Sequence, residues 1–586
     1  MTYSIFYSTR HLEIFCGILA AIAIFPAYFF PGLGSRFFRA FECHAGALAR
    51  RPRLAFLAAT LFPMLVRLLL LPVFPIPQPR VHDEFSYLLL GDTLSHGRLA
   101  NPTPPEWRHF ETEYELVRPT YASQYQPAQG VVLAAGQTIA KHPWWGVWFS
   151  AGLMCGALYW ALAPVLPLQW ALFGSAVAAL QFGIFGFWMN SYFGGAVAAV
   201  AGALVFGSLN RLKRIARGKE AAGLGALAGF GLVILFASRP AEALLWAGVI
   251  AWMEIARIRR QWRSRNGPVT IGSIAAILLV VLAGAGGLAF YNQRVTGHAL
   301  DLPYALYRRA YGVPQSYWVQ PAVLVASFSN PQLEANYKDQ LAFWMRRYSP
   351  ALLWNSERRR LRDFWRFFIG PFLSPTILFL AFAVRRRKVF PWICASAPFI
   401  LDHAAYHAWY PQQSGSETVL IVYLLVECWR QMRIAGRGRG RAVSRQLTGA
   451  FALAVFLLSA GLTARATGSP LPRWAGNILA GLAPEPSARE LAIRQLENEP
   501  GRHLVFVHYG PAHSWYDEWV FNGADLMGSR IVFARVCDPV SDLALTRALS
   551  DRDLWMADPD AKTPLRRIRA ELLSPDKTGR RQFDLN

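Results

Sequence analysis

The chain has 586 residues, of which 54% are hydrophobic and only 16% are charged, whereas about a quarter of the residues in a soluble protein carry charge. This composition excludes an ordinary soluble fold. The formal net charge of +24 would suit nucleic-acid binding, but the basic residues form short clusters between apolar runs, as the positive-inside rule requires of membrane proteins. We therefore expect a multi-span membrane protein with no nucleic-acid partner.

About twelve apolar runs approach the roughly 20 residues needed to cross about 30 Å of hydrocarbon. No small-residue cleavage site follows the first run, so we expect a retained span and not a cleaved signal peptide. The predicted spans lie near residues 12–31, 54–75, 145–163, 168–187, 193–209, 221–237, 241–256, 269–291, 366–384, 389–405, 415–432 and 447–465.

Five basic clusters predict the orientation, because each follows an odd-numbered run and one alternating topology satisfies them all. They lie at 50–53, 211–217, 257–265, 385–388 and 430–441. This topology places the N-terminus, the loop 76–144, the loop 292–365 and the C-terminal tail outside the cytoplasm.

The loop 292–365 is the exception, since it also carries several arginines between residues 346 and 362. Long loops cross membranes largely regardless of charge. The run 351–368 mixes Leu, Trp and Phe with Arg at roughly helical spacing. It fits an interfacial helix lying on the membrane or an ordinary juxtamembrane helix.

The tail changes character after Pro470. The segments 503–509 (HLVFVHY) and 531–536 (IVFARV) are typical of strands, and charged helical stretches surround them. We expect three regions: an N-terminal span and juxtamembrane segment at 1–53, a membrane domain at 54–470 and a small soluble α/β domain at 471–586.

The first long loop opens with an acidic pair, Asp83 and Glu84, directly after His82 at the outer end of a span. Adjacent carboxylates point in different directions in a helix or a strand, so they do not form a matched acid/base pair. One can act as a base while the other orients a neighbour. Equally, both can cap the helix predicted at 85–96, where negative charge is favourable.

Further along this loop, Arg118, Tyr121, Tyr125 and Gln126 precede an apolar helix predicted at 128–140. Such side chains suit sugar hydroxyls and phosphate oxygens. They also suit simple anchoring at the membrane interface.

Two glycines in the outer turn 190–195 (NSYFGG) favour close helix packing over ligand binding. In the next outer turn, Arg239 interrupts an apolar stretch. A charge there is costly unless it is paired. Glu242 is the obvious partner, and the alternative is that Arg239 binds a phosphate, which a guanidinium does bidentately.

The outer turn 402–413 contains Asp402, His403, His407 and Tyr410. The two histidines share a helix face if the turn is helical, and with Asp402 they resemble a metal site. Two histidines alone are weak evidence, so we favour a phosphate- or sugar-facing cluster. The sequence contains no P-loop and no GxSxG motif.

Together these stretches resemble the GT-C class of membrane glycosyltransferases, which includes protein O-mannosyltransferases and lipid A aminoarabinose transferases. The segments HDEFSYLLLGDTLSHGRLANPTPP and RPTYASQYQPAQG look like its bacterial RgtA/B/C/D-like branch, as do WMNSYFGGAVAAVAGALVFG, SRPAE, YNQRVTGHALDLPY and HYGP with DEWVFNGAD. One departure is that the acidic pair follows the second apolar run and not the first, which implies an added N-terminal span.

The resemblance implies a GT-C-like α-helical polytopic fold and a polyprenyl-phosphate-linked sugar donor. It also implies that an acidic residue of the first outer loop is the base or orients the acceptor, which here is Asp83 with Glu84 beside it. Basic residues near the outer surface would hold the lipid phosphate, for which Arg239 is the best candidate. His82, Arg118, Tyr121, Tyr125, Gln126, His403, His407 and Tyr410 are the further substrate-binding candidates. Many members use no metal in catalysis, so we expect no cofactor, with only weak support for a divalent metal.

The leading hypothesis is a glycosyltransferase of the bacterial inner membrane that acts on a lipid, glycan or protein acceptor at the outer face. The alternative is a transporter or flippase of a lipid-linked saccharide. Transporters often place ionisable residues near the bilayer midplane and contain inverted repeats. Here the polar clusters gather at the outer ends of spans and no repeat is evident, which favours the enzyme.

Overall fold

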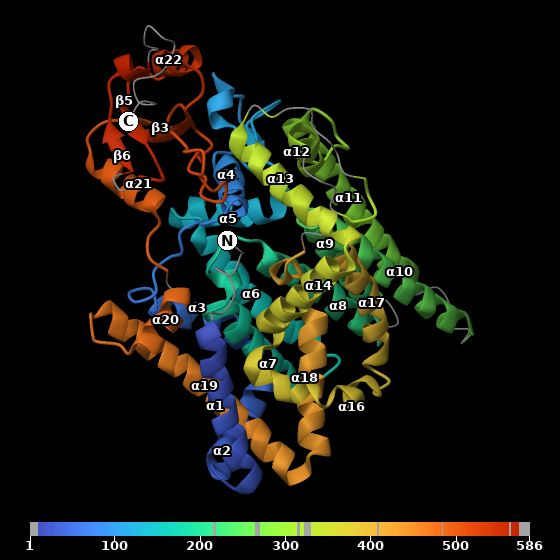
Figure 1. Ribbon diagram of the computed structural model, residues 1–586. Helices are drawn as coiled ribbons and strands as arrows, with labels where there is room; N and C mark the ends of the chain where they lie inside the picture. Colours follow the sequence, from blue (N-terminus) through green and yellow to red (C-terminus); the bar gives the residue numbers. More distant parts are fainter. Residues whose placement is uncertain are drawn as a thin grey trace. The chain divides into compact units, whose positions relative to one another are not determined.

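The computed structural model describes residues 10–214, 218–263, 270–312, 317–321, 328, 330–406, 409–482, 484–561 and 564–573. The chain forms two compact units, each assembled from three separate segments. Unit 1 comprises residues 1–77, 144–286 and 349–484, and unit 2 comprises residues 78–143, 287–348 and 485–586. Figure 1 labels many of the helices and several of the strands.

Unit 1 is helical. Its elements are α1 (Arg10–Phe29), α2 (Ser35–Ala49), α3 (Pro52–Leu69), α6 (Trp144–Leu162), α7 (Leu168–Ala178), η3 (Ala179–Ile184), η4 (Phe187–Met189), α8 (Gly195–Leu212), α9 (Lys219–Phe236), α10 (Pro240–Arg263), most of α11 (Thr270–Thr296), α14 (Pro350–Phe364), η6 (Trp365–Ile369), α15 (Gly370–Ile377), α16 (Leu380–Val384), α17 (Phe390–Ala405), η7 (Pro411–Gln413), α18 (Thr418–Ala435), α19 (Arg437–Ala466) and α20 (Arg473–Leu482).

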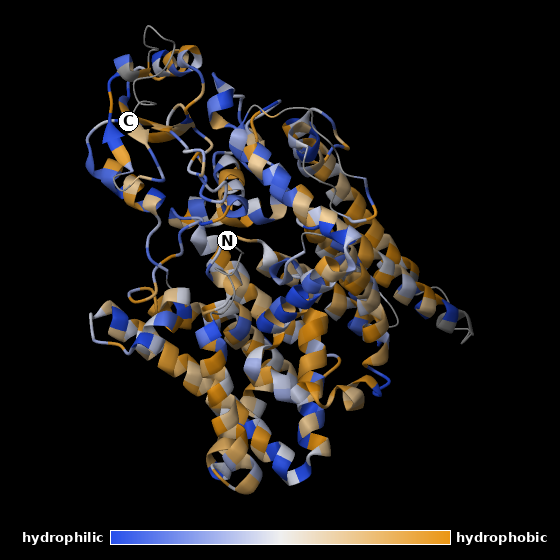
Figure 2. Ribbon diagram, viewed as in Figure 1, coloured by the Kyte–Doolittle hydropathy of each residue, from blue (hydrophilic) through white to orange (hydrophobic). Residues whose placement is uncertain are grey.

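Within the described residues, seven helices are long and apolar enough to cross a membrane: α1, α3, α6, α8, α9, α11 and α19. In α1 and α11 only 11% of the most apolar window is buried within the protein. Leu278, Leu279 and Leu282 of α11 are between 55% and 71% exposed. Because water disfavours so much apolar surface, these helices mark a membrane protein, and Figure 2 shows the apolar stretches along them.

Each of the twelve predicted spans falls on helical structure, although the run 366–384 is divided among η6, α15 and α16. The number of spans that cross the bilayer remains a prediction. The run 351–368 forms α14 and the start of η6, with Trp354 and Leu361 exposed and Arg360 buried. The Arg360 guanidinium donates to the carbonyls of His403 and Tyr406 at the end of α17.

Unit 2 combines helices with two small sheets. Its elements are α4 (His82–Ser95), η2 (Trp107–Phe110), β1 (Glu115–Leu116), β2 (Ala122–Ser123), α5 (Pro127–Ala140), the end of α11, α12 (Pro303–Tyr311), α13 (Pro331–Met345), η5 (Arg346–Tyr348), α21 (Ala488–Asn498), β3 (His503–Val507), β4 (Ile531–Arg535), α22 (Pro539–Ala548), β5 (Asp553–Ala557), β6 (Leu565–Arg567) and η8 (Ala570–Leu573).

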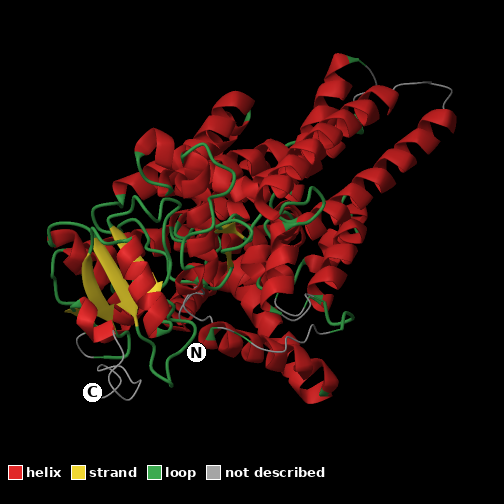
Figure 3. Cartoon of the chain, turned by 90° about the horizontal axis from the view of Figure 1, so that it is seen from above, coloured by secondary structure: helices red, strands yellow, loops and turns green. Residues whose placement is uncertain are grey.

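The tail contains a four-stranded sheet in the order β4-β3-β5-β6, in which β3 runs parallel to β4 and β5, and β6 runs antiparallel to β5. The strands predicted at 503–509 and 531–536 are therefore confirmed as β3 and β4. Figure 3 shows this sheet with helices beside it.

Both faces of β3 are buried, as its continuous apolar sequence requires. On one face, Leu504 and Phe506 pack with Phe110 and Tyr121 of the first loop. On the other, Val505 and Val507 pack with Leu496 of α21. The tail and the loop around η2 thus share one hydrophobic core. The predicted domain boundaries near residues 53 and 470 remain predictions.

Candidate functional site

Helices α4 and α5 position the acidic pair. They approach closely because each presents a glycine to the other: a Cβ on Gly91 would lie 2.7 Å from the Leu133 Cβ, and one on Gly130 would lie 2.3 Å from the Leu90 Cγ. Pro127 occupies the first turn of α5, where its missing N–H costs nothing. This close packing of α4 and α5 brings the first turn of α4, which carries the acidic pair, near the residues that precede Pro127.

Asp83 and Tyr125 meet at this point. The Tyr125 hydroxyl donates a hydrogen bond to Asp83 Oδ1. The Tyr125 ring stacks on Tyr87 with centroids 4.1 Å apart, and its backbone carbonyl accepts from the Tyr291 hydroxyl at 3.1 Å. Burial, followed by the charge of Asp83, raises the pKa of Tyr125 well above its ordinary value, so the phenol remains a donor. Asp83 itself is half-buried and is within reach of solvent.

Glu84 has different surroundings. Its side chain is only 2% exposed, and its Oε2 accepts from the Arg80 backbone N–H at 2.9 Å. A carboxylate that binds a backbone amide at a helix N-terminus is favourable to helix stability. Of the two alternatives for the acidic pair, Glu84 thus matches the capping one, whereas Asp83 accepts a hydrogen bond from a tyrosine hydroxyl.

A group of buried charges lies behind the pair, and the sequence reading did not find it. Glu111, Glu113 and Glu115 are all at most 5% exposed, as is Glu518. Arg535 binds Glu518 through its guanidinium and donates to Gln332 at 2.6 Å. The alternating pattern E-T-E-Y-E was visible in the sequence, but its cationic partner Arg535 is more than 400 residues away.

The pKa values of the ionisable side chains in this group shift in different directions. Burial, then the negative charge of Glu518, raises the pKa of Glu113 to about 8. Burial opposes ionisation of Glu518 as well, but Arg535 and the Tyr509 hydroxyl outweigh it and lower the pKa of Glu518. His82 is buried with Nδ1 3.9 Å from Glu113 Oε2, and burial lowers its pKa to about 4 despite the charge of Glu518. At neutral pH, Glu113 carries a proton and His82 is uncharged.

Of the remaining substrate-binding candidates in this loop, some have a packing role and others have polar atoms that could bind a ligand. The Tyr121 ring is 2% exposed, and its hydroxyl donates to the Asn522 carbonyl at 3.2 Å, which is a packing role. The Arg118 guanidinium lies 3.8 Å from the centre of the Trp107 ring. Gln126 is 6% exposed, and among the described residues neither atom of its side-chain amide has a hydrogen-bond partner. A buried unpaired amide costs about 1–3 kcal/mol, so Gln126 is suited to a ligand hydroxyl or a bound water.

In unit 1 the structure brings Arg239 and the turn 402–413 together. Arg239 Nε lies 3.6 Å from Glu242 Oε1, as the pairing alternative predicts. Glu242 is close enough to His403 and Glu417 for their charges to interact. His403 Nε2 lies 3.0 Å from Glu417 Oε2, and its ring stacks on Trp409.

Two further candidates lie in this turn. The Tyr410 N–H donates to the Gln413 side chain at 3.1 Å. His407 lies outside the described residues, so the predicted pair of histidines on one helix face remains a prediction.

Gly195, in the turn 190–195, packs closely, as predicted. A Cβ on Gly195 would lie 1.9 Å from the Trp188 indole nitrogen. Asn190 accepts from the Arg67 Nε at 3.0 Å and donates to the carbonyls of Ile184 and Gly186. This turn is a structural element.

One group in unit 2 has the composition of a metal site. The ligand atoms of His109, Cys537 and Asp542 lie within 4.8 Å of one another. His109 Nε2 is 2.9 Å from Asp542 Oδ1, which also accepts from the Cys537 N–H at 2.9 Å. Burial raises the pKa of the Cys537 thiol to about 12, whereas metals bind the thiolate. The group ties η2 to α22 through these hydrogen bonds, and its His, Cys and carboxylate ligand types are those that bind zinc.

No family model matches the chain, and no curated protein does. Among solved structures, the chain is similar to the Archaeoglobus fulgidus oligosaccharyltransferase. The complex with Zn and sulfate is 11% identical, with a TM-score of 0.42 over 85% of this chain and 68% of that one.

Two other structures of the same oligosaccharyltransferase give comparable identities and TM-scores. AglB with an inhibitory peptide and a dolichol-phosphate is 11% identical, with a TM-score of 0.41 over 86% and 69% of the two chains. The form tethered to an acceptor peptide is 10% identical, with a TM-score of 0.44 over 83% and 64%.

Proposed function

We propose that this chain is a GT-C glycosyltransferase that moves a sugar from a polyprenyl-phosphate-linked donor to an acceptor at the outer face of the bacterial inner membrane. The observation that carries the proposal is the Asp83 carboxylate, half-buried at the start of α4 and bonded to a permanently protonated Tyr125.

The chemistry follows from this arrangement. As the bond between the sugar C1 and the phosphate oxygen breaks, the lipid phosphate leaves with the bonding electrons. The acceptor oxygen forms a new bond to C1, and Asp83 takes the acceptor proton or fixes the orientation of the acceptor. The Tyr125 hydrogen bond holds the carboxylate in one rotamer, so that it is pre-organised for this step.

Two more residues are proposed to bind the substrate, one in each unit. The amide of Gln126, buried without a partner among the described residues, is suited to a sugar hydroxyl because it can both donate and accept. Arg239 is proposed to hold the donor phosphate, because its 3.6 Å separation from Glu242 exceeds an ordinary hydrogen bond. A phosphate would offer its guanidinium shorter, bidentate contacts.

The grouping of the predicted outer segments and of the predicted cytoplasmic clusters supports an outer-face site. Most of the two long loops and of the tail that the sequence assigns to the outside belong to unit 2, whereas residues 349–365 and 471–484 of these regions belong to unit 1. The basic clusters assigned to the cytoplasm also gather together. Arg53, Arg211, Arg257, Lys388 and Arg430 line three pockets that share Pro164 and Arg214.

The test uses membranes that contain the full chain, a panel of polyprenyl-phosphate hexoses and pentoses, and measurement of both released polyprenyl phosphate and glycosylated acceptor. Asp83→Asn should lower transfer at least about 100-fold, the usual contribution of a general base. Asp301→Asn is the matched control, because Asp301 is an exposed carboxylate paired with Arg309. Full activity of Asp83→Asn would remove Asp83 from the mechanism. Movement of an unchanged lipid-linked saccharide across the membrane would identify a transporter instead.

A further inference from the structure

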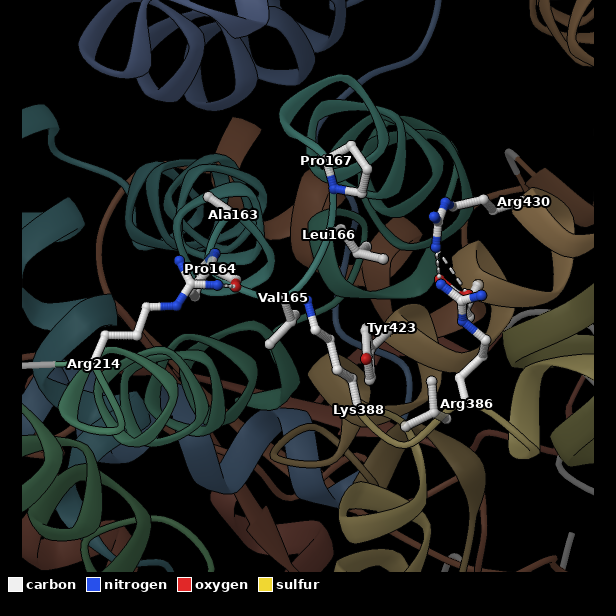
Figure 4. A pocket seen from close by; sticks show the side chains of 12 residues that line it. Ala163, Pro164, Val165, Leu166, Pro167, Arg214, Arg386, Lys388, Tyr423 and Arg430 are labelled. Carbon is white, nitrogen blue, oxygen red and sulfur yellow. Dashed lines mark hydrogen bonds and ion pairs between the residues drawn. The ribbon is translucent and has the colours of Figure 1, made fainter. Parts of the chain in front are cut away.

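Three connected pockets in unit 1 lie where the basic clusters meet. The first, of about 300 Å³, is lined by Arg214, Arg386, Lys388 and Arg430. The second, of about 700 Å³, shares Pro164, Arg214 and Lys388 with the first. The third, of about 750 Å³, shares Pro164 and Arg214 with both. Figure 4 shows Lys388 extending between Arg214 on one side and Arg386 with Arg430 on the other.

The charge of the first two pockets is strongly unbalanced. Eight basic side chains line them, against the acidic side chains of Glu254 and Glu427 alone: Lys213, Arg214, Arg257, Arg259, Arg386, Arg387, Lys388 and Arg430. Glu427 lies within 4 Å of Arg386 and Arg430, and Glu254 pairs with Arg257. In the described part of the chain, no ion pair involves Arg387 or Lys388. A pocket that concentrates positive charge in this way attracts an anion.

Apolar side chains continue from the same pockets. The third pocket is lined by Phe56, Leu57 and Trp160, and the second by Trp252. Leu57 is 50% exposed and Trp252 is 45% exposed. A free phosphate ion makes no favourable contact with this apolar surface, whereas the acyl chains of a lipid can cover it. Basic pockets between membrane helices are a recognised setting for anionic lipid headgroups.

We propose that these pockets bind an anionic phospholipid on the side of the membrane that carries the basic clusters, with its phosphate beside Lys388 and Arg214 and its acyl chains along Trp160 and Trp252. This site lies among residues of unit 1 other than Arg239 and is independent of the proposed transfer reaction.

The experiment titrates short-chain phosphatidylglycerol into the full-length protein in a nonionic detergent and counts bound lipid by native mass spectrometry. The test variant is Arg387→Gln with Lys388→Gln, two exposed side chains that line the pockets. Each basic residue near an anionic headgroup contributes roughly fivefold in affinity, so binding should weaken about 30-fold. The matched control is Arg358→Gln with Arg359→Gln, which removes the same charge from the exposed face of α14.

Two further arms identify the ligand. Phosphatidylcholine of the same chain length should bind much more weakly than phosphatidylglycerol, and millimolar inorganic phosphate should not displace the lipid. Equal loss of binding in both double variants, or none in either, would overturn the site. Displacement by inorganic phosphate alone would show that the pocket takes a free anion and not a lipid.

Discussion

At the scale of single residues, the structure separates two carboxylates that the sequence left equivalent. Glu84 binds a backbone amide, and Asp83 receives the Tyr125 hydroxyl. The sequence showed that the two side chains diverge, but it could not show which one faces a phenol 42 residues away. The acidic group around Glu113 was missed for the same reason: nothing local marks a carboxylate as buried when its partner, Arg535, comes from the tail.

The Asp83 contact predicts the effect of Tyr125→Phe. The ring and its stacking on Tyr87 remain, so folding should be preserved, while Asp83 loses a hydrogen bond to its charged form. Such bonds contribute about 1.5–3 kcal/mol, so sugar transfer should fall roughly 10- to 100-fold in kcat/KM. Tyr348→Phe, at a tyrosine that is 65% exposed, should leave transfer unchanged. Wild-type activity in Tyr125→Phe would show that the hydroxyl does not support the reaction.

The raised pKa of the Glu113 carboxyl predicts that the stability of the folded protein depends on pH. Its pKa rises from 4.5 to about 8 in the folded protein, so between these values the folded state holds a proton that the unfolded state has released. Stability therefore falls as pH rises through this window. Glu113→Gln removes the effect and should raise the unfolding midpoint most at pH 8. The measurement is thermal unfolding in detergent from pH 5 to 8, with the exposed Glu334→Gln as control; parallel curves for Glu113→Gln and wild type would contradict this assignment.

At the scale of elements, the helices and the two tail strands follow from local pattern, because apolar run length and β-branched content are properties of neighbouring residues. The pairing of elements does not. The contact between α4 and α5 depends on Gly91 and Gly130 facing Leu133 and Leu90, and either glycine alone reads as a weak point in a helix. The division of the run 366–384 among η6, α15 and α16 coincides with Gly370, whose φ is 61°, and with Pro371 and Pro375, which hydropathy alone does not register.

The α4–α5 contact can be tested with Gly91→Ala. The new methyl would lie 2.7 Å from the Leu133 Cβ, which cannot rotate away, so the helices must separate. Overpacking of this kind costs about 1–3 kcal/mol, and transfer should fall because α4 carries Asp83. Gly287→Ala is the control, since nothing lies within 4 Å of that position. Unchanged stability and activity in Gly91→Ala would mean that this helix contact does not position the site.

At the scale of the whole molecule, segments that the charge rule assigns to the same side of the membrane fall largely in the same unit. The basic clusters line neighbouring pockets, and residues 78–143 and 287–348 of the two long loops join residues 485–586 of the tail in unit 2. The sequence could group these segments by side because positive charge resists translocation. It could not reveal that the tail's sheet would share a core with Phe110 and Tyr121, because that contact joins residues about 400 positions apart.

The topology predicts which residues an impermeant reagent reaches. In a background without native cysteines, Leu300→Cys and Val540→Cys, at positions 92% and 78% exposed in unit 2, should react with a membrane-impermeant maleimide on intact cells. Arg387→Cys should react only after the membrane is permeabilised. Labelling of position 387 on intact cells, or the absence of labelling at positions 300 and 540, would contradict the proposed orientation.

The division of unit 2 into three segments has a consequence for its biogenesis. Its first segment begins near residue 78, but its sheet lies beyond residue 500. At about 5–20 residues per second, synthesis of the intervening chain takes roughly 20–85 seconds. Throughout that interval the first loop has emerged without the strands that cover Phe110 and Tyr121. On the proposed topology, the first loop would wait outside the cytoplasm until the last hundred residues of the chain are made, so we expect a truncation near the C-terminal end to leave Phe110 and Tyr121 uncovered.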